Sequence, residues 1–321
     1  MTTLAEPAVL ATEKPRASGR SDTPTWRFTA PLVAVLAATT VVPIGYAVYL
    51  SFFDWNWGSR FRFVGLHNYA VTLTNAEFWG SIGRTASFTV MALAIELVAG
   101  LALALAVDRL TRGVGWLRTL FILPLMMSGI VVSMVWKVML DPTLGVVPWF
   151  LRHLGLSAVN LLGNPSTALP TLAFLDAWWQ SGFVFIILYA GVQSLPKEPF
   201  EAAEVDGAGY WSRFRYLTLP LLLPLIAVVA AVRAVDCFKL FDLVFGATNG
   251  GPGTATQSLQ MLAYRTAFKG HQMSASMTML VVYTLFVMIA VIVALGLRRV
   301  VGRRAGAGGA GPQSGESAEE A

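Results

Sequence analysis

Residues 201–220 read EAAEVDGAGYWSRFRYLTLP, a short stretch of acidic and small residues between two long apolar runs. The chain as a whole is 55% hydrophobic and only 13% charged, whereas an average soluble domain carries about 25% charged residues. A lipid bilayer accepts such apolar surface and water does not, so the composition predicts an all-α membrane protein. In a protein of that class, a polar stretch broken by glycines is expected to lie outside the lipid.

Six apolar segments have the length of transmembrane helices, because about 20 residues cross a hydrocarbon layer of about 30 Å. The expected spans are 29–53, 82–107, 118–140, 169–193, 216–240 and 276–297. The first apolar run is too long for a signal peptide and lacks a clear cleavage site, which favours a retained anchor. We therefore expect a transmembrane domain over 29–297 with a core of about 82–297, an N-terminal tail over 1–28, and a disordered, low-complexity tail over 298–321.

The distribution of basic residues predicts the orientation in the membrane. If the N-terminus is cytoplasmic, the inner segments contain roughly twice as many lysine and arginine residues as the outer segments. This agrees with the rule that cytoplasmic loops are richer in basic residues. Both termini and residues 194–215 are then cytoplasmic. The net charge of +5 follows from this bias, so we expect a membrane partner and no nucleic acid.

The reactive residue types give no sign of enzyme chemistry. Cys237 is the single cysteine, and the three histidines are far apart in the sequence. No G-x-x-x-x-G-K-[ST] phosphate-binding loop is present in the sequence. We therefore expect no catalytic site, no metal site and no cofactor bound by this chain.

The opening stretch has the signals of a short cytoplasmic helix. Pro199 suits a first-turn position, and Glu201 and Glu204 lie where the helix dipole favours acids. Gly207 and Gly209 would end the helix. The residues alone leave two interpretations open, a helix that docks on a partner and an amphipathic helix that rests on the membrane surface.

The same stretch resembles a known family. Glu201-Ala202-Ala203, then Gly207, then Leu219-Pro220 is similar to the EAA loop in permease subunits of binding-protein-dependent ABC importers. Three further elements resemble the carbohydrate-import branch of that family, and these are FVGLHNY (63–69), FDLVFGATNGGPGTATQSL (241–259) and YRTAF (264–268). The resemblance therefore covers most of the chain.

This resemblance implies a type I ABC importer permease of a bacterial inner membrane, with six transmembrane helices, a cytoplasmic coupling helix and a sugar or polyol as substrate. The implied partners are a second permease subunit in a heterodimer, an extracytoplasmic solute-binding protein and two cytoplasmic ATPase subunits, which would bind the ATP. By the same resemblance, Glu201 contacts a basic residue of the ATPase, Ala202 and Ala203 pack in its cleft, and Gly207 permits the turn.

Ionisable residues inside spans are functional hypotheses, and sugars bind through aromatic faces and hydrogen-bonding groups. The substrate-pathway candidates are Asp176, Trp178, Trp179, Gln180, Arg233 and Asp236, and the segment 233–242 is expected to form part of the cavity. Glu96 and Asp242 are further ionisable residues in or near spans. Two other interpretations stay open. The tryptophans would also suit an interfacial belt, and Arg233 would also suit a structural pair with a carboxylate on a neighbouring span.

Further alternatives concern the outer loop and the function. Residues 246–260 either line the outer mouth or meet the binding protein, or they form a tight loop between the last two spans. An importer of peptides, amino acids or ions is disfavoured by the elements at 63–69 and 241–268. An ion-coupled secondary transporter would not explain an EAA helix on the cytoplasmic side. The sequence leaves open which sugar, polyol or glycerol phosphate is carried.

Overall fold

The computed structural model describes residues 26–155 and 160–307. The chain divides into two units, Met1–Tyr46 and Ala47–Ala321, and helix α1 (Trp26–Ser51) crosses the boundary between them. In the first unit the described residues all belong to α1, whose exposed apolar side chains, such as Leu36 and Val41, suit a lipid environment. The expected first span is confirmed, and the predicted N-terminal tail lies outside the described residues up to residue 25.

The described part of the second unit is helical apart from one small hairpin. Strands β1 (Phe53–Asp54) and β2 (Arg62–Phe63) pair antiparallel, with Phe53 opposite Phe63. The remaining elements are, in order, α2 (His67–Thr74), α3 (Ala76–Asp108), α4 (Val114–Ile122), η1 (Leu123–Met126), α5 (Gly129–Met139), α6 (Val146–His153), α7 (Pro165–Gln193), α8 (Glu198–Val205), α9 (Tyr210–Arg213), η2 (Phe214–Thr218), α10 (Leu219–Phe238), η3 (Val244–Thr248), α11 (Leu259–Tyr264), η4 (Arg265–Lys269) and α12 (Met273–Ala307).

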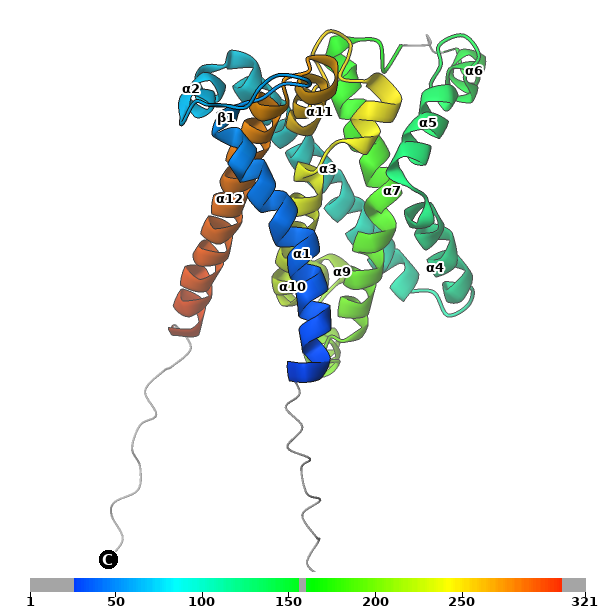
Figure 1. Ribbon diagram of the computed structural model, residues 1–321. Coiled ribbons are helices and arrows are strands. Elements are labelled where there is room, and N and C mark those ends of the chain that lie inside the picture. The colour runs from blue at the N-terminus through cyan, green and yellow to red at the C-terminus, as the bar shows by residue number, and fades with distance from the viewer. Residues whose placement is uncertain (1–25, 156–159, 308–321) are drawn as a thin grey trace, which may run out of the picture. The chain divides into compact units, whose positions relative to one another are not determined.

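Within the described residues, four helices are long and apolar enough to cross a membrane. They are Thr29–Ser51, Ala76–Asp108, Pro165–Gln193 and Tyr210–Phe238. The fourth runs without a break from α9 through the π-helical turn η2 into α10. The helices α3 and α7 pack along each other (Figure 1), and α10 contacts both. These helices occupy four of the six spans expected from the sequence.

The expected third span, 118–140, is not a continuous helix. The helices α4 and α5 meet at a bend of 97°, so the pair forms either a broken span or a re-entrant loop. Pro124 is the second residue of the 3₁₀ turn η1 at this break, and proline cannot donate a hydrogen bond within a helix. The backbone stays extended at Met127 and Ser128 before α5 begins at Gly129. Counting this pair as one span brings the number of candidates to five.

Helix α12 occupies the expected sixth span. Its apolar part within the residues tested for a span is Met273–Ile289, which is shorter than the other candidates. The helix continues past residue 297 to Ala307, so the start of the predicted C-terminal tail is helical. Residues 308–321 of that tail lie outside the described residues.

The core of the second unit lies where α3, α7 and α10 meet. Val184, Phe185 and Leu188 of α7 are fully buried there, together with Ala104 of α3 and Val229 of α10. In lipid, helices gain no hydrophobic stabilisation from contact with each other, so association depends on close packing and on polar bonds between helices. Both kinds of contact occur in this core.

Candidate functional site

Helix α8, which contains the stretch that opened the sequence analysis, links the two long helices α7 and α10. Pro199 lies in its first turn, and Glu198 and Glu201 are the acids that complement the dipole there. The helix ends in a glycine turn, since Gly207 adopts a φ of +75° that favours glycine. The Ala208 N–H then donates to the Ala203 carbonyl at 2.8 Å. The predicted short helix and its glycine stop are confirmed.

The surface of α8 is open. Glu201, Ala202 and Gly207 are exposed and Ala203 is half-buried. Val205 is 89% exposed although it is apolar. This helix therefore presents an acid, small residues and one uncovered apolar side chain to its surroundings. Both interpretations left open by the sequence, a docking surface and a membrane-surface helix, require this exposure.

Side chains fasten α8 and the start of the next helix to their neighbours. Glu204 of α8 pairs with Arg213 of α9 at 3.2 Å. The Arg109 guanidinium, at the end of α3, lies 3.8 Å from the centre of the Tyr210 ring of α9. Such a cation–π contact is worth about 0.5–1 kcal/mol at an exposed site. These two contacts connect α8 to α9 and α9 to the end of α3.

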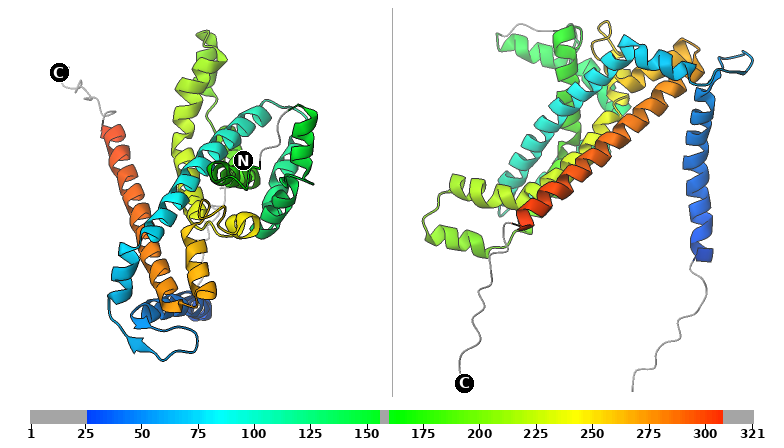
Figure 2. Two further views of the ribbon diagram at one scale, coloured as in Figure 1. Left: turned by 90° about the horizontal axis from the view of Figure 1, so that it is seen from above. Right: turned by 90° about the vertical axis from the view of Figure 1, so that its left-hand side faces the viewer.

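A cavity of about 660 Å³ separates α8 from the ends of the long helices. Phe200 and Glu201 line it from α8, and Asp108 of α3 and Gln193 of α7 line it from the other side. The Gln193 amide donates a hydrogen bond to the Asp108 carboxylate, which ties the ends of α3 and α7 together. The α8 segment thus lies at the end of α7 that is remote from α6 and α11, as two directions of view agree (Figures 1 and 2).

An ion cluster is buried among the three central helices. The Arg233 Nε on α10 donates to the Glu96 carboxylate on α3 at 2.7 Å. Its Nη2 donates to Glu96 at 2.8 Å and to Asp176 on α7 at 2.8 Å. The three side chains are at most 9% exposed. The structural pairing that the sequence left open for Arg233 is therefore confirmed, and it involves two neighbouring helices.

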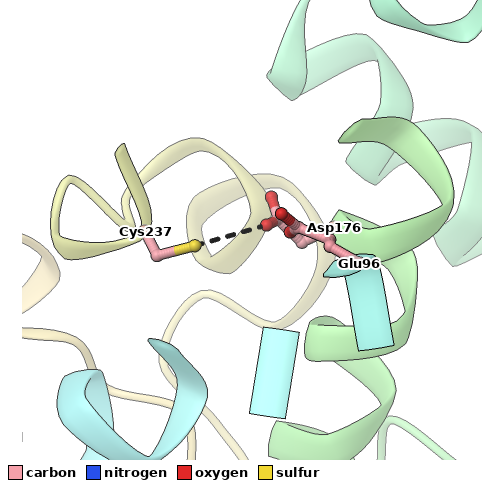
Figure 3. A group of neighbouring side chains, drawn as sticks. All are labelled: Glu96, Asp176 and Cys237. Atoms are coloured by element: carbon pink, nitrogen blue, oxygen red, sulfur yellow. Dashed lines mark hydrogen bonds between the residues drawn. The ribbon is translucent and has the colours of Figure 1, made fainter. Parts of the chain in front are cut away.

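Glu96, Asp176 and Cys237 form a group whose oxygen and sulfur atoms lie within 4.8 Å of one another (Figure 3). Groups of this kind can hold a metal ion. In this one, however, the Arg233 guanidinium donates to both carboxylates and also lies 3.6 Å from the Cys237 sulfur. The guanidinium therefore already supplies the positive charge among these atoms. We interpret the group as the binding partners of Arg233 and not as a metal site.

A cavity of about 290 Å³ lies directly beside this cluster. It brings together five of the six predicted pathway residues, which are Asp176, Trp179, Gln180, Arg233 and Asp236. Trp178 does not line it. That ring is 40% exposed and meets the Trp136 ring edge-on, with ring centres 5.3 Å apart, an arrangement that suits the belt interpretation.

Two further charged residues of the cavity, Lys239 and Asp242, come from the segment 233–242, which was predicted to be part of it. Lys239 lines the cavity and pairs with Asp236 at 3.3 Å. Asp242 also lines it, near Gly129 at the break before α5, where a Cβ on the glycine would lie 2.9 Å from the Asp242 carboxylate. Gly129 therefore packs against two residues that line the cavity, Asp242 and Trp179. The signal that was present in the sequence is the density of charge in 233–242.

The loop between α10 and α11 is tightly packed near its C-terminal end. Thr256, Gln257 and Ser258 are almost fully buried. The Gln257 side chain bridges Glu77 at 3.0 Å and Arg265 at 3.2 Å. These contacts show that residues 256–258 are tightly packed, and they do not test whether 246–260 lines the outer mouth or meets the binding protein.

Comparison with known proteins adds to this geometry. The family model described as "Binding-protein-dependent transport system inner membrane component" matches residues 96–306. The trehalose/maltose transport system permease protein MalF of Thermococcus litoralis is 35% identical over 73% of this chain and 80% of its own length. The sn-glycerol-3-phosphate transport system permease protein UgpA of Agrobacterium fabrum is 34% identical over 68% of this chain and 75% of its own.

A solved structure has the same fold. It is a chain of a bacterial ABC transporter involved in the import of the acidic polysaccharide alginate, and it superposes with a TM-score of 0.75. The match covers 86% of this chain and 96% of that chain at 21% sequence identity.

Proposed function

Because the chain belongs to the family of inner membrane components of binding-protein-dependent transport systems, we propose that it is a permease subunit of an ATP-driven sugar importer. A solute-binding protein outside the membrane would deliver the substrate, and this chain would provide part of the path across the bacterial inner membrane. The observation that carries the proposal is α8, an exposed helix fastened to the ends of the membrane helices.

The proposed role of α8 is to couple ATP hydrolysis to movement of the membrane helices. Two cytoplasmic ATPase subunits would bind ATP and receive α8 in a cleft. Glu201 would contact a basic residue there, Ala202 and Ala203 would allow close approach, and Gly207 would hold the turn into α9. The exposure of these residues and the link from Glu204 to Arg213 support this role. Movement of the ATPase pair would then rock the helices behind α8.

The proposed substrate path includes the cavity beside Arg233. Trp179 offers an aromatic face, and Gln180, Asp176 and Asp236 offer hydrogen-bonding groups. A sugar or a related polyol matches this mixture. Relatives named for trehalose and maltose support a sugar, while the relative named for glycerol phosphate keeps a phosphorylated polyol as a second candidate.

A second permease subunit would complete the path as a heterodimer. The exposed apolar side chains of α4 and α5, among them Trp116 and Val138, offer surface for that partner or for lipid. With α8 at the ATPase, both chain termini would be cytoplasmic, as the basic residues predict.

The coupling role is tested by charge reversal on α8. We expect Glu201→Lys to reach the membrane normally but to abolish uptake and association with the ATPase, because a lysine would face the basic residue of the cleft. The assay is substrate-stimulated ATP hydrolysis by the reconstituted transporter. Asp206→Lys, the same change at an exposed position that does not line the α8 cavity, serves as the control and should retain most activity. Full stimulated hydrolysis by Glu201→Lys would show that the coupling assignment is wrong.

A further inference from the structure

The cavity beside Arg233 has an unbalanced set of charges. Three carboxylates line it, those of Asp176, Asp236 and Asp242, whereas Arg233 and Lys239 are the cations that line it within the described part of the chain. A fourth carboxylate, Glu96, lies against Arg233. Acidic groups therefore outnumber basic ones around this space.

Neither cation is free to meet a ligand. The Arg233 side chain is 3% exposed and donates to Glu96 and Asp176, and its third nitrogen lies 3.6 Å from Asp236. Lys239 is paired with the same Asp236 at 3.3 Å. An incoming anion would have to break one of these pairs to gain a positive partner.

One carboxylate, in contrast, is available. Asp242 is exposed and makes no ion pair with any residue that the structure describes. It lies at the α4–α5 break, beside Gly129, which also approaches the Trp179 ring. A ligand in the cavity would therefore meet a free negative charge next to an aromatic face.

We propose that this cavity admits neutral sugars or polyols and rejects anionic ones, with Asp242 as a specificity-determining residue. The proposal rests on the proposed function and narrows its substrate class. The hydroxyl groups of a neutral sugar can donate to Asp242 and Asp176. A carboxylate or phosphate group would be repelled instead, because like charges brought together suppress binding of the wrong partner.

The charge of the cavity can be measured without knowing the substrate. In the reconstituted transporter, a cysteine at Gln180, a half-buried lining residue, would be labelled with a cationic and an anionic methanethiosulfonate reagent of similar size. Relative to a free thiol, we expect the cationic reagent to be favoured by about tenfold or more, as expected near uncompensated acids. The native Cys237 is 3% exposed and should not react.

Adding Asp242→Lys should remove this preference, whereas Asp54→Lys, the same change in the outer hairpin, should leave it intact. Equal reactivity of both reagents in the Gln180→Cys protein would overturn the proposal, as would an Asp242→Lys variant that keeps the preference.

Uptake separates this proposal from the proposed function. Vesicles with the complete transporter would be offered maltotriose, trigalacturonate, glycerol and sn-glycerol 3-phosphate, with and without the binding protein. Uptake confined to neutral probes supports the proposal. Uptake of an acidic probe as fast as its neutral counterpart overturns it while leaving the permease role intact. Uptake of any probe that does not depend on ATP would overturn the proposed function, and the substrate assignment with it.

Discussion

Arg233 is buried and bonds to carboxylates on two neighbouring helices. Its guanidinium joins α3, α7 and α10 through Glu96 and Asp176, and none of the three side chains is well exposed. An isolated buried charge is costly, and it becomes tolerable only when partners and hydrogen bonds surround it. The cluster therefore fixes how the three helices pack, because a different register would leave a charge unpaired.

Removal of the arginine should destabilise the protein strongly. We expect Arg233→Met to cost about 3–5 kcal/mol, because two buried carboxylates would lose their shared partner. The measurement is thermal unfolding of the purified protein in detergent. Arg62→Met is the matched control, since Arg62 pairs with Asp54 at 3.3 Å but is 76% exposed, and such surface pairs contribute about 0–1 kcal/mol. Equal losses in both variants would contradict a structural role for the buried cluster.

The sequence identified the members of this cluster but not their pairing. Arg233 and Asp176 stand out because charge is rare in spans, yet whether they meet each other depends on the rotation of helices far apart in sequence. No local pattern sets that rotation. The segment 233–242 was expected at the cavity, but the pairing of Lys239 with Asp236 was not. The lysine lies in the turn after α10, which ends at Phe238, and no local pattern sets the direction of a side chain there.

Helix positions were easier to predict than helix breaks. The thickness of a bilayer fixes how long an apolar run must be, so α3, α7 and α10 lie close to the expected spans. Proline alone does not locate a break. Pro224 lies inside the continuous helix α10, whereas Pro124 lies at the bend between α4 and α5. Neighbouring helices decide the outcome, since they can satisfy the backbone groups that a proline frees.

The packing between α4 and α7 depends on a glycine. A Cβ added at Gly182 of α7 would overlap the backbone carbonyl of Phe121 on α4, and backbone cannot move aside as a side chain can. We expect Gly182→Ala to cost about 1–3 kcal/mol through overpacking, measured by thermal unfolding. Gly115→Ala on α4 is the control, because nothing lies within 4 Å of its added Cβ, and alanine favours helix by about 1 kcal/mol over glycine. A Gly182→Ala variant as stable as the control would refute this close contact.

In the second unit, α7 lies between two segments to which we have given different roles, α8 and the loops near α6 and α11. The α8 segment follows one end of α7, and α6 precedes the other (Figure 1). A cavity lined by Asp141, Asn160 and Pro252 places the segment before α7 beside the loop between α10 and α11. The sequence predicted this division from hydropathy and basic residues, and it predicted α8 from its acids and glycines. For the cavity beside Arg233, the sequence could predict which residues take part but not how they are arranged. The reason is that its walls come from segments that are distant in the chain.

The orientation of these two ends in the membrane is a prediction that labelling from outside the cell can test. Leu144, after α5, and Val205, at the end of α8, are 90% and 89% exposed in this chain, so a cysteine at either site should react once reached when the chain is produced without the ATPase subunits. We expect a membrane-impermeant maleimide to label Leu144→Cys in intact cells, and Val205→Cys only after the membrane is opened. The unmodified protein is the control, since its single cysteine, Cys237, is buried. The reverse pattern would place α8 outside the cell, where no cytoplasmic ATPase could reach it, and would overturn both the orientation and the coupling role.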